Sequence, residues 1–342
     1  MNKDFTVQYK EAWELISTSA HIVIIPHHNP DGDAIGSALA VYNLLINAGK
    51  NVEVVSPNHY PDFLKWLPGN GQVIIYEENR EAVAASLQQA DLLIFTDFNC
   101  MDRIDPLSKI VEPLSCKKIL IDHHPEPEQF ADVIISDTSV CSTAELVLHF
   151  IEGSGLKAFL NKEVASCLLT GIMTDTGSFS FNSSNPETFM AVAELLKYGV
   201  DKDSIFSSIY NNYSEDRMNL LGFCLHNKMT ILPEFRTGFI AITQEELDRF
   251  NFEPGDTEGF VNYPLSVRGF AFAALFIERD DYIKISFRSK GSFPANQFSG
   301  KHFNGGGHLN AAGGNSELTM KETLIKFQQL LPRYKEGLIK SN

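Results

Sequence analysis

The chain has 342 residues, of which 44% are hydrophobic and 21% are charged, and its formal net charge is −15. This length predicts two domains rather than one core, and the acidic balance argues against a large non-specific nucleic-acid surface. The chain has no apolar run long enough to cross a bilayer and its N-terminus lacks a signal-peptide pattern, so we expect a cytoplasmic protein with no membrane partner.

The first half of the chain alternates short apolar runs with helical patterns. Strands are expected at residues 21–26, 51–56, 92–97, 118–122 and 133–135. Helices are expected at residues 7–19, 34–48, 143–151 and 162–173. Continuous apolar runs are typical of strands that are buried on both faces. The alternation therefore predicts an α/β fold with a doubly wound, mostly parallel sheet.

The second half of the chain has a different character. Residues 186–232 read as mostly helical, and residues 210–216 interrupt this pattern like a connector. Beyond about residue 235, two strand-like runs at 269–277 and 282–288 flank the polar segment 278–281. This arrangement is typical of a β-hairpin. It predicts a second, smaller domain of mixed α/β structure.

Three of the predicted strands run directly into acidic and histidine side chains. His27, Asp31 and Asp33 follow the first of these strands, Asp97 ends the second, and the triplet Asp122–His124 ends the third. In open α/β sheets the ligand site lies beyond the carboxyl ends of the strands. Because a lone buried carboxylate is costly unless it is paired or bound to a metal, we expect these side chains to share one metal cluster.

Each cluster taken alone has a plainer explanation. The first can be an Asp-rich loop in which Asp33 caps a helix that begins at Ala34. Asp175, followed by Thr176 and Gly177, would by itself be read as a turn or helix-end residue. Taken together, the oxygen and imidazole ligands suit Mn²⁺ and also admit Mg²⁺, Fe²⁺, Co²⁺ or Zn²⁺. Six such residues exceed the needs of one ion, which favours two metals about 3.5–4 Å apart.

The other informative segment lies near the C-terminus and contains Gly305, Gly306, Gly307 and His308. Consecutive glycines let backbone N–H groups approach a phosphate closely. Arg268 and Arg288 belong to the two predicted strands of the same domain and could clamp phosphates through bidentate hydrogen bonds. The alternatives are a flexible glycine turn and two solvated arginines on the face of a strand.

Taken together, these motifs resemble the DHH phosphoesterase superfamily, and most closely its stand-alone nanoRNase A branch. The naming motif is Asp122-His123-His124, and His27, Asp31 and Asp33 look like the first motif. Asp97 looks like the second motif and Asp175 like the fourth, while residues 304–313 look like a DHHA1 domain. The resemblance implies a DHH catalytic domain at 1–200, a helical connector at 201–234 and a DHHA1 substrate-binding domain at 235–338.

The resemblance also implies a role for each motif residue. His27 and Asp31 would hold one metal, Asp97 would bridge the two, and the other would be held by Asp33, His123 and Asp175. Together the metals would activate a bridging water for in-line attack on phosphorus. The expected catalytic residues are Asp97, Asp122, which would orient a ligating imidazole, and His124, which would contact the scissile phosphate. The substrate's other phosphate or terminal nucleotide would be bound by Arg268, Arg288, Gly305, Gly306, Gly307 and His308.

The function implied by this resemblance is Mn²⁺-dependent hydrolysis of oligoribonucleotides of a few residues. The expected partner is therefore short single-stranded RNA or a nucleotide. A phosphatase for 3′-phosphoadenosine 5′-phosphate and a cyclic-dinucleotide phosphodiesterase remain alternatives. A non-catalytic nucleotide-binding protein is a more distant one, because unpaired buried carboxylates would be costly to keep. A processive exonuclease is disfavoured, because it would need an extended basic groove with stacking platforms. The sequence leaves the oligomeric state open.

Overall fold

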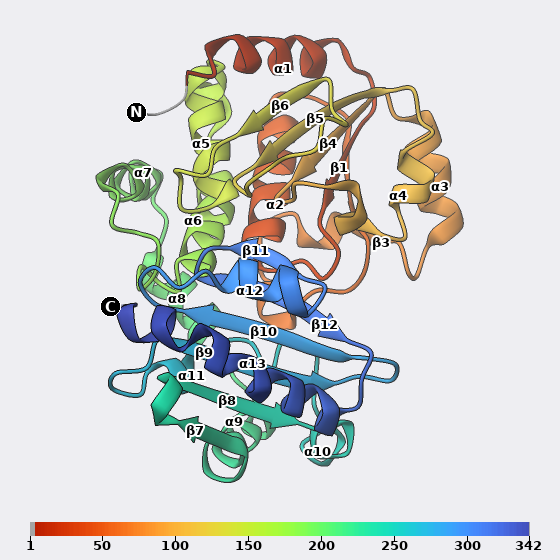
Figure 1. The fold of residues 1–342 in the computed structure, drawn as a ribbon. Helices are drawn as coiled ribbons and strands as arrows, with labels where there is room; N and C mark the ends of the chain where they lie inside the picture. The colour runs from red at the N-terminus through yellow and green to blue at the C-terminus, as the bar shows by residue number, and fades with distance from the viewer. Residues whose placement is uncertain (1–3, 342) are drawn as a thin grey trace. The chain divides into compact units, whose positions relative to one another are not determined.

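The computed structural model describes residues 4–341, which form two compact units that divide between Asn212 and Tyr213. Each unit is built on its own six-stranded sheet (Figure 1). The division falls between α8 (Lys202–Tyr210), which ends the first unit, and α9 (Glu215–Phe223), which begins the second. Within residues 4–341, no helix combines the length and the apolar character that a membrane span requires.

Sheet A of the first unit is parallel throughout and has the strand order β3-β2-β1-β4-β5-β6. Its strands are β1 (Ile22–Pro26), β2 (Val52–Ser56), β3 (Val73–Ile75), β4 (Leu92–Thr96), β5 (Lys117–Asp122) and β6 (Val133–Ser136). The expected doubly wound parallel sheet is therefore confirmed. The strand order reverses between β1 and β4, and such a switch point is where an open α/β sheet leaves room for a ligand.

Helices cover both faces of sheet A (Figure 1). One core is shared by α1 (Thr6–Thr18), α2 (Gly32–Asn47), α5 (Thr143–Gly153), α6 (Lys162–Asp175), α7 (Pro186–Leu196) and α8. The other core includes side chains of α3 (Arg80–Gln89) and α4 (Ser108–Val111). Ile22 and Ile24 of β1 join the first core, whereas Val23 and Ile25 join the second. Successive side chains of a strand alternate between faces, which explains why a continuous apolar run is required here.

Two glycines allow α2 and α6 to pack closely. A Cβ atom on Gly36 would lie 2.7 Å from the carbonyl oxygen of Cys167, and one on Gly171 would lie 2.7 Å from Oδ1 of Asp33. Such separations are too short for real Cβ atoms, so neither position tolerates a side chain without a shift of its surroundings. The close approach brings the first turn of α2, which carries Asp33, against the last turns of α6, which end at Asp175.

Sheet B of the second unit has the order β11-β12-β10-β9-β8-β7, and it is mixed because β8 and β9 are parallel while its other pairs are antiparallel. Its strands are β7 (Met229–Leu232), β8 (Thr237–Ile242), β9 (Phe272–Glu278), β10 (Ile283–Ser289), β11 (Gly306–His308) and β12 (Ala311–Ser316). Its helices are α9, α10 (Gln244–Arg249), α11 (Asn262–Leu265), α12 (Ala295–His302) and α13 (Met320–Lys340). The antiparallel pairing of β9 with β10 confirms the predicted hairpin.

Two local interpretations of the sequence of the second unit differ from the structure. Arg268 lies in an exposed turn between α11 and β9, so its placement in a strand was wrong. The reason is that Gly269 has φ +83°, which interrupts the extended backbone before β9 begins. The glycine segment, for which a flexible turn was the alternative, forms strand β11 from Gly306 to His308 and pairs with β12. Arg288 does lie in a strand, β10.

Candidate metal centre

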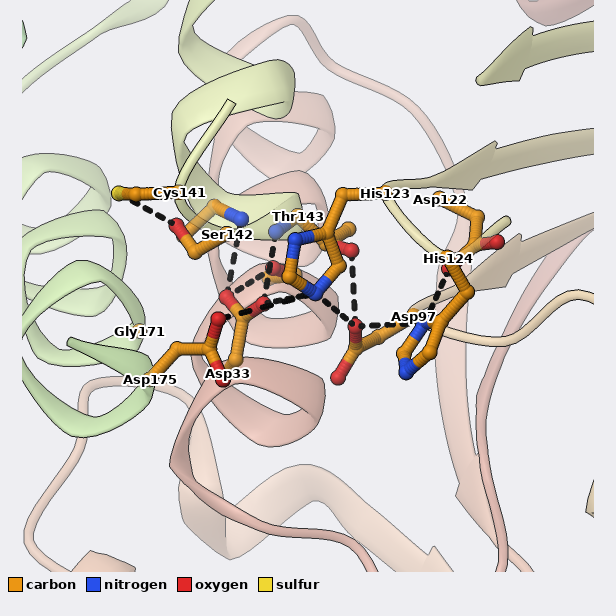
Figure 2. A network of polar contacts seen from close by, with 12 residues as sticks. Asp33, Asp97, Asp122, His123, His124, Cys141, Ser142, Thr143, Gly171 and Asp175 are labelled. Atoms are coloured by element: carbon orange, nitrogen blue, oxygen red, sulfur yellow. Dashed lines mark hydrogen bonds and ion pairs between the residues drawn. The ribbon is translucent and has the colours of Figure 1, made fainter. Parts of the chain in front are cut away.

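The predicted acids and imidazoles of the first unit converge at the carboxyl edge of sheet A (Figure 2). His27 directly follows β1, Asp97 directly follows β4, and Asp122 is the last residue of β5. Since β4 pairs with both β1 and β5, these three strand ends lie side by side. Asp33 enters from the first turn of α2 and Asp175 from the last residue of α6. All six expected metal ligands are therefore brought together.

These residues form two groups that could each hold an ion. One consists of His27, Asp31 and Asp97, the other of Asp33, His123 and Asp175, and within each group the candidate ligand atoms lie within 4.8 Å of one another. Nε2 of His123 is 3.7 Å from Asp175 Oδ2 and 3.9 Å from Asp33 Oδ2. Ligands about 2.1 Å from a shared ion are at most about 4.2 Å apart, so these separations fit coordination.

Asp97 lies between the two groups. Its Oδ2 is 3.5 Å from Nε2 of His27, and its Oδ1 is 3.6 Å from Nε2 of His123. Its backbone is left-handed, with φ +68°, a conformation that costs roughly 1–3 kcal/mol for a residue other than glycine. The backbone N–H donates to the carbonyl of Ile121 in β5, which helps to hold this conformation. One carboxylate is thus directed at both candidate ion positions.

The adjacent pair Asp122 and His124 completes the cluster. Oδ1 of Asp122 is 2.7 Å from Nδ1 of His124, which is also 3.7 Å from Oδ1 of Asp97. Asp122 is fully buried, and its Oδ2 has no hydrogen-bond partner. The hydrogen bond fixes the ring of His124, and Figure 2 shows its other nitrogen directed away from Asp122. The imidazole that Asp122 is seen to hold is therefore that of His124.

The N-cap of α2 differs from the one that the plainer explanation of this cluster requires. Asp31, not Asp33, is the N-cap, because its Oδ1 accepts hydrogen bonds from the backbone N–H groups of Asp33 and Ala34 at 3.0 and 3.1 Å. Asp33 lies inside the helix and its carboxylate is directed into the cluster. The alternative in which Asp33 caps a helix from Ala34 is therefore not the one that forms, because α2 begins two residues earlier, at Gly32.

The sequence reasoning missed Thr143, the first residue of α5. Its backbone N–H donates to Asp33 and its hydroxyl donates to Asp97. The sequence does carry a helix-start signal, Ser142 followed three residues later by Glu145. That signal places the start of the helix but does not tell which groups the first turn will face.

The residues expected to bind the substrate belong to the second unit. Arg288 and His308 lie on β10 and β11, and both are opposite Ala311 of the intervening strand β12. Directly paired residues have side chains on the same face of a sheet, so a methyl group separates a guanidinium and an imidazole. Gly306 and Gly313 form the next row, and a Cβ on either would meet nothing within 4 Å. Sheet B therefore has unfilled space above Gly306 and Gly313, next to two groups that can bind a phosphate.

Burial and mutual repulsion dominate the electrostatics of the metal centre. Burial, with the charges of Asp97 and Asp31, raises the pKa of Asp33 well above its usual range. Burial and the charge of Asp31 do the same for the pKa of Asp97. Burial lowers the pKa of His27. Burial by itself would lower the pKa of His124, but the hydrogen bond to Asp122 and the charges of Asp97 and Asp122 together outweigh this and raise that pKa. Divalent cations would offset the same repulsion that otherwise favours protonation.

Metal-free protein should lose stability as the pH rises. Unfolded Asp33 and Asp97 titrate near the ordinary value of 3.8, whereas burial raises both pKa values in the fold. Between the unfolded and folded values the native state holds more protons, so the free energy of unfolding falls with increasing pH. We expect Asp97→Asn to reduce this slope and to raise the melting temperature above wild type near pH 8. Thermal scans of EDTA-treated protein between pH 3.8 and about pH 8 measure both the pH slope and the melting temperature.

The matched control is Asp203→Asn, which alters an exposed carboxylate on α8. It should leave the pH dependence as it is in the wild type. An Asp97→Asn protein with the wild-type slope would show that Asp97 is not confined with other acids in the folded protein.

Comparisons with known proteins agree with this geometry. Residues 21–172 match the DHH family, N-terminal domain, and residues 238–334 match the DHHA1 domain. A crystal structure of an exopolyphosphatase-related protein from Bacteroides fragilis superimposes with a TM-score of 0.92 at 42% identity, covering 97% of both chains. The two matched domains fall in the two compact units.

Two curated relatives carry named activities. The bifunctional oligoribonuclease and PAP phosphatase NrnA of Thermus thermophilus is 31% identical over 295 residues, which are 85% of this chain and 83% of that protein. The cyclic-di-AMP phosphodiesterase GdpP of Bacillus subtilis is 27% identical over 346 residues, which are 95% of this chain but 49% of that protein. The chain therefore belongs to the DHH family of phosphoesterases, hydrolases that act on phosphoester bonds, and carries a DHHA1 domain within its second unit.

Proposed function

We propose that this protein hydrolyses the phosphodiester bonds of very short oligoribonucleotides with two divalent cations, Mn²⁺ foremost. The observation that carries the proposal is the position of Asp97, whose two oxygens are directed at two separate groups of ligand-type residues. A single structural ion would not require a shared carboxylate. The oligoribonuclease activity in the name of the Thermus thermophilus relative supports this choice of substrate.

The two groups would divide the ions between them. His27 and Asp31 would hold one cation, Asp33, His123 and Asp175 would hold the other, and Asp97 would serve both. When bound, such cations lower the pKa of a water and supply positive charge at the phosphoryl oxygens. The protein's own contribution is to hold these ligands in fixed positions at a largely buried site.

His124 has a separate role in this proposal. Because Asp122 holds its Nδ1 at 2.7 Å, Nε2 is the atom with which His124 would contact the scissile phosphate or give a proton to the leaving oxygen. The raised pKa of His124 favours the protonated ring that such a donor needs. Asp122 is the positioning partner, in the way that a carboxylate orients a ligand imidazole.

The second unit would bind the remainder of the substrate. The row formed by Arg288, Ala311 and His308 offers two phosphate-binding groups around a small side chain. The open glycine row next to it leaves room for a ribose or a base. Arg268, in its exposed turn, remains part of the proposed substrate-binding set. The boundaries 1–200, 201–234 and 235–338 remain our proposal for the catalytic domain, the connector and the substrate-binding domain.

A second candidate function is hydrolysis of cyclic dinucleotides or of 3′-phosphoadenosine 5′-phosphate. The relatives that favour it are GdpP, which aligns with 95% of this chain, and the bifunctional NrnA. Purified protein with Mn²⁺ should therefore be given linear dinucleotides, a cyclic dinucleotide and 3′-phosphoadenosine 5′-phosphate in parallel. The highest kcat/KM on the linear dinucleotides supports the proposal, and a preference for either other compound replaces it.

Loss of the shared carboxylate should be the most damaging single change at the metal centre. We expect Asp97→Ala to reduce kcat/KM by more than about 100-fold, beyond the 10–100-fold typical of residues that only support a metal ligand. Hydrolysis of a dinucleotide with saturating Mn²⁺ measures the loss. Asp203→Ala, which removes an exposed carboxylate, is the control. Full turnover by Asp97→Ala, or by wild type stripped of metal, would contradict the two-metal mechanism.

Activity should fall as the RNA becomes longer. The phosphate-binding groups of the second unit are few and the chain is acidic overall, so we expect kcat/KM to be higher on a dinucleotide than on an RNA of about 24 nucleotides, with a log–log salt slope of roughly −0.7 per phosphate contact. Rates at several salt concentrations on both substrates give the two quantities. Faster hydrolysis of the long RNA with a steep slope would instead indicate a general exonuclease.

The imidazole on β11 should affect substrate binding more than chemistry. We expect His308→Ala to raise KM about 10- to 100-fold, the effect of losing a hydrogen bond to a charged group, with kcat and Mn²⁺ binding little changed. Steady-state kinetics on a dinucleotide and a Mn²⁺ titration separate these effects. His226→Ala, which lies on another element before β7, should leave KM unchanged. A fall in kcat at constant KM would place His308 in the chemical step.

A further inference from the structure

We infer that Thr143 is a positioning residue that couples the two metal positions, because it holds Asp33 and Asp97 at the same time. This inference rests on the proposed two-metal function and extends it to a residue outside the ligand set. Thr143 begins α5, which is not one of the strands or helices that supply ligands. It makes no contribution of its own to coordination in this proposal and acts through the two carboxylates.

Both carboxylates accept hydrogen bonds from the first turn of α5 (Figure 2). The backbone N–H of Thr143 donates to Oδ2 of Asp33 at 2.7 Å, and that of Ala144 donates to Oδ1 at 2.9 Å. The hydroxyl of Thr143 donates to Oδ1 of Asp97 at 2.8 Å. Asp33, Asp97 and Thr143 are all buried, so water does not compete for these bonds. Thr143 therefore forms a hydrogen bond to each of the two carboxylates.

The first turn of α5 is itself held firmly. Ser142, the N-cap, accepts a hydrogen bond from the backbone N–H of Glu145 at 3.1 Å. The buried carboxylate of Glu145 accepts from the backbone N–H of Cys141 at 2.9 Å and from the hydroxyl of Thr188 in α7 at 3.0 Å. These bonds tie the turn to the segment before it and to a second helix. Thr143 is thus presented to the metal centre by a rigid support.

Helix α6 closes the other side of Asp33. A Cβ at Gly171 would lie 2.6 Å from Cβ of Ala144 and 2.7 Å from Oδ1 of Asp33. The backbone of α6 therefore packs directly against both the first turn of α5 and the carboxylate. Asp33 is confined between two helices, whereas the side-chain restraint from α5 on Asp97 is the single hydroxyl of Thr143.

Because Thr143 holds Asp33 through its backbone and Asp97 through its hydroxyl, a substitution can test the two contacts separately. Substitution by valine keeps the backbone N–H groups that hold Asp33 and removes only the hydroxyl that holds Asp97. Asp33, His123 and Asp175 keep their own positions, so the Mn²⁺ that they hold should lose little affinity, although Asp97 serves both ions. The ion that depends on His27, Asp31 and Asp97 should bind more weakly, by the 10–100-fold typical when a partner of a metal ligand is lost.

The experiment is a calorimetric Mn²⁺ titration of the full-length chain, with electron paramagnetic resonance to detect spin coupling between two bound ions. We expect two Mn²⁺ in wild type and in Thr143→Ser, which keeps the hydroxyl. In Thr143→Val the first ion should lose little affinity, while the second, and the spin-coupled signal, should need about 10–100-fold more Mn²⁺. Thr170→Val is the matched control, because this buried threonine donates only within α6, to the carbonyl of Ser166 at 2.9 Å.

The outcomes distinguish the inference from the proposed function. Two ions in wild type with unchanged affinities in Thr143→Val would overturn the inference alone, as would a Thr143→Ser protein as weak as Thr143→Val. Fewer than two ions in wild type would overturn the two-metal function and the inference with it. If circular dichroism shows that Thr143→Val does not fold, the Thr143→Ser and Thr143→Ala pair decides: equal affinities contradict the inference, and weaker second-ion binding in the alanine variant supports it.

Discussion

The structure of the first unit depends on confining several carboxylates at one buried edge of a parallel sheet. Such an arrangement is unfavourable by itself, because burial and like-charge repulsion both oppose ionisation of Asp33 and Asp97. The protein offsets part of this cost with hydrogen bonds from the start of α5 and with nearby imidazoles. Bound cations supply the rest in our proposal, so the same repulsion that destabilises the metal-free protein creates affinity for metal.

The remainder of the first unit serves this confinement. The parallel pairing of β1, β4 and β5 brings three loops to one edge. Close packing at Gly36 and Gly171 brings the ends of α2 and α6 together, so that Asp33 and Asp175 reach the same point. A core on each face of sheet A holds the strands in place. The left-handed backbone of Asp97 is kept by this rigid surrounding, as strained residues at functional sites commonly are.

The second unit solves a different physical problem. In our proposal it binds a flexible polyanion without a strongly positive surface, since the chain as a whole carries a formal charge of −15. A local arrangement of Arg288, His308 and glycine backbone on sheet B can do so with few contacts. Few contacts give modest affinity for any one phosphate and no advantage to a long strand. This is the physical reason for linking the fold to short substrates.

The sequence by itself determined five of the six strands of sheet A, all except β3, and the types of residue at the ends of β1, β4 and β5. A continuous apolar run such as residues 22–25 indicates a strand that is buried on both faces. Acids that follow such strands lie at the carboxyl edge of the parallel sheet. It was therefore possible to name His27, Asp31, Asp33, Asp97 and His123 before their distances were known, whereas Asp175, which ends a helix, has no such signal of its own. Local signals were less reliable where neighbouring residues compete, as at Asp31 and Asp33, where the N-cap falls on the former.

Only the tertiary structure decided how the site is held together. Thr143 is 110 residues from Asp33 and 46 from Asp97, and no local pattern tells which carboxylates a helix start will face. The partner of Asp122, the exposed turn of Arg268 and the strand formed by Gly306–His308 likewise follow from packing and backbone geometry. Periodicity and residue type can be read directly from the sequence, whereas hydrogen bonds between distant segments form only once the helices have packed.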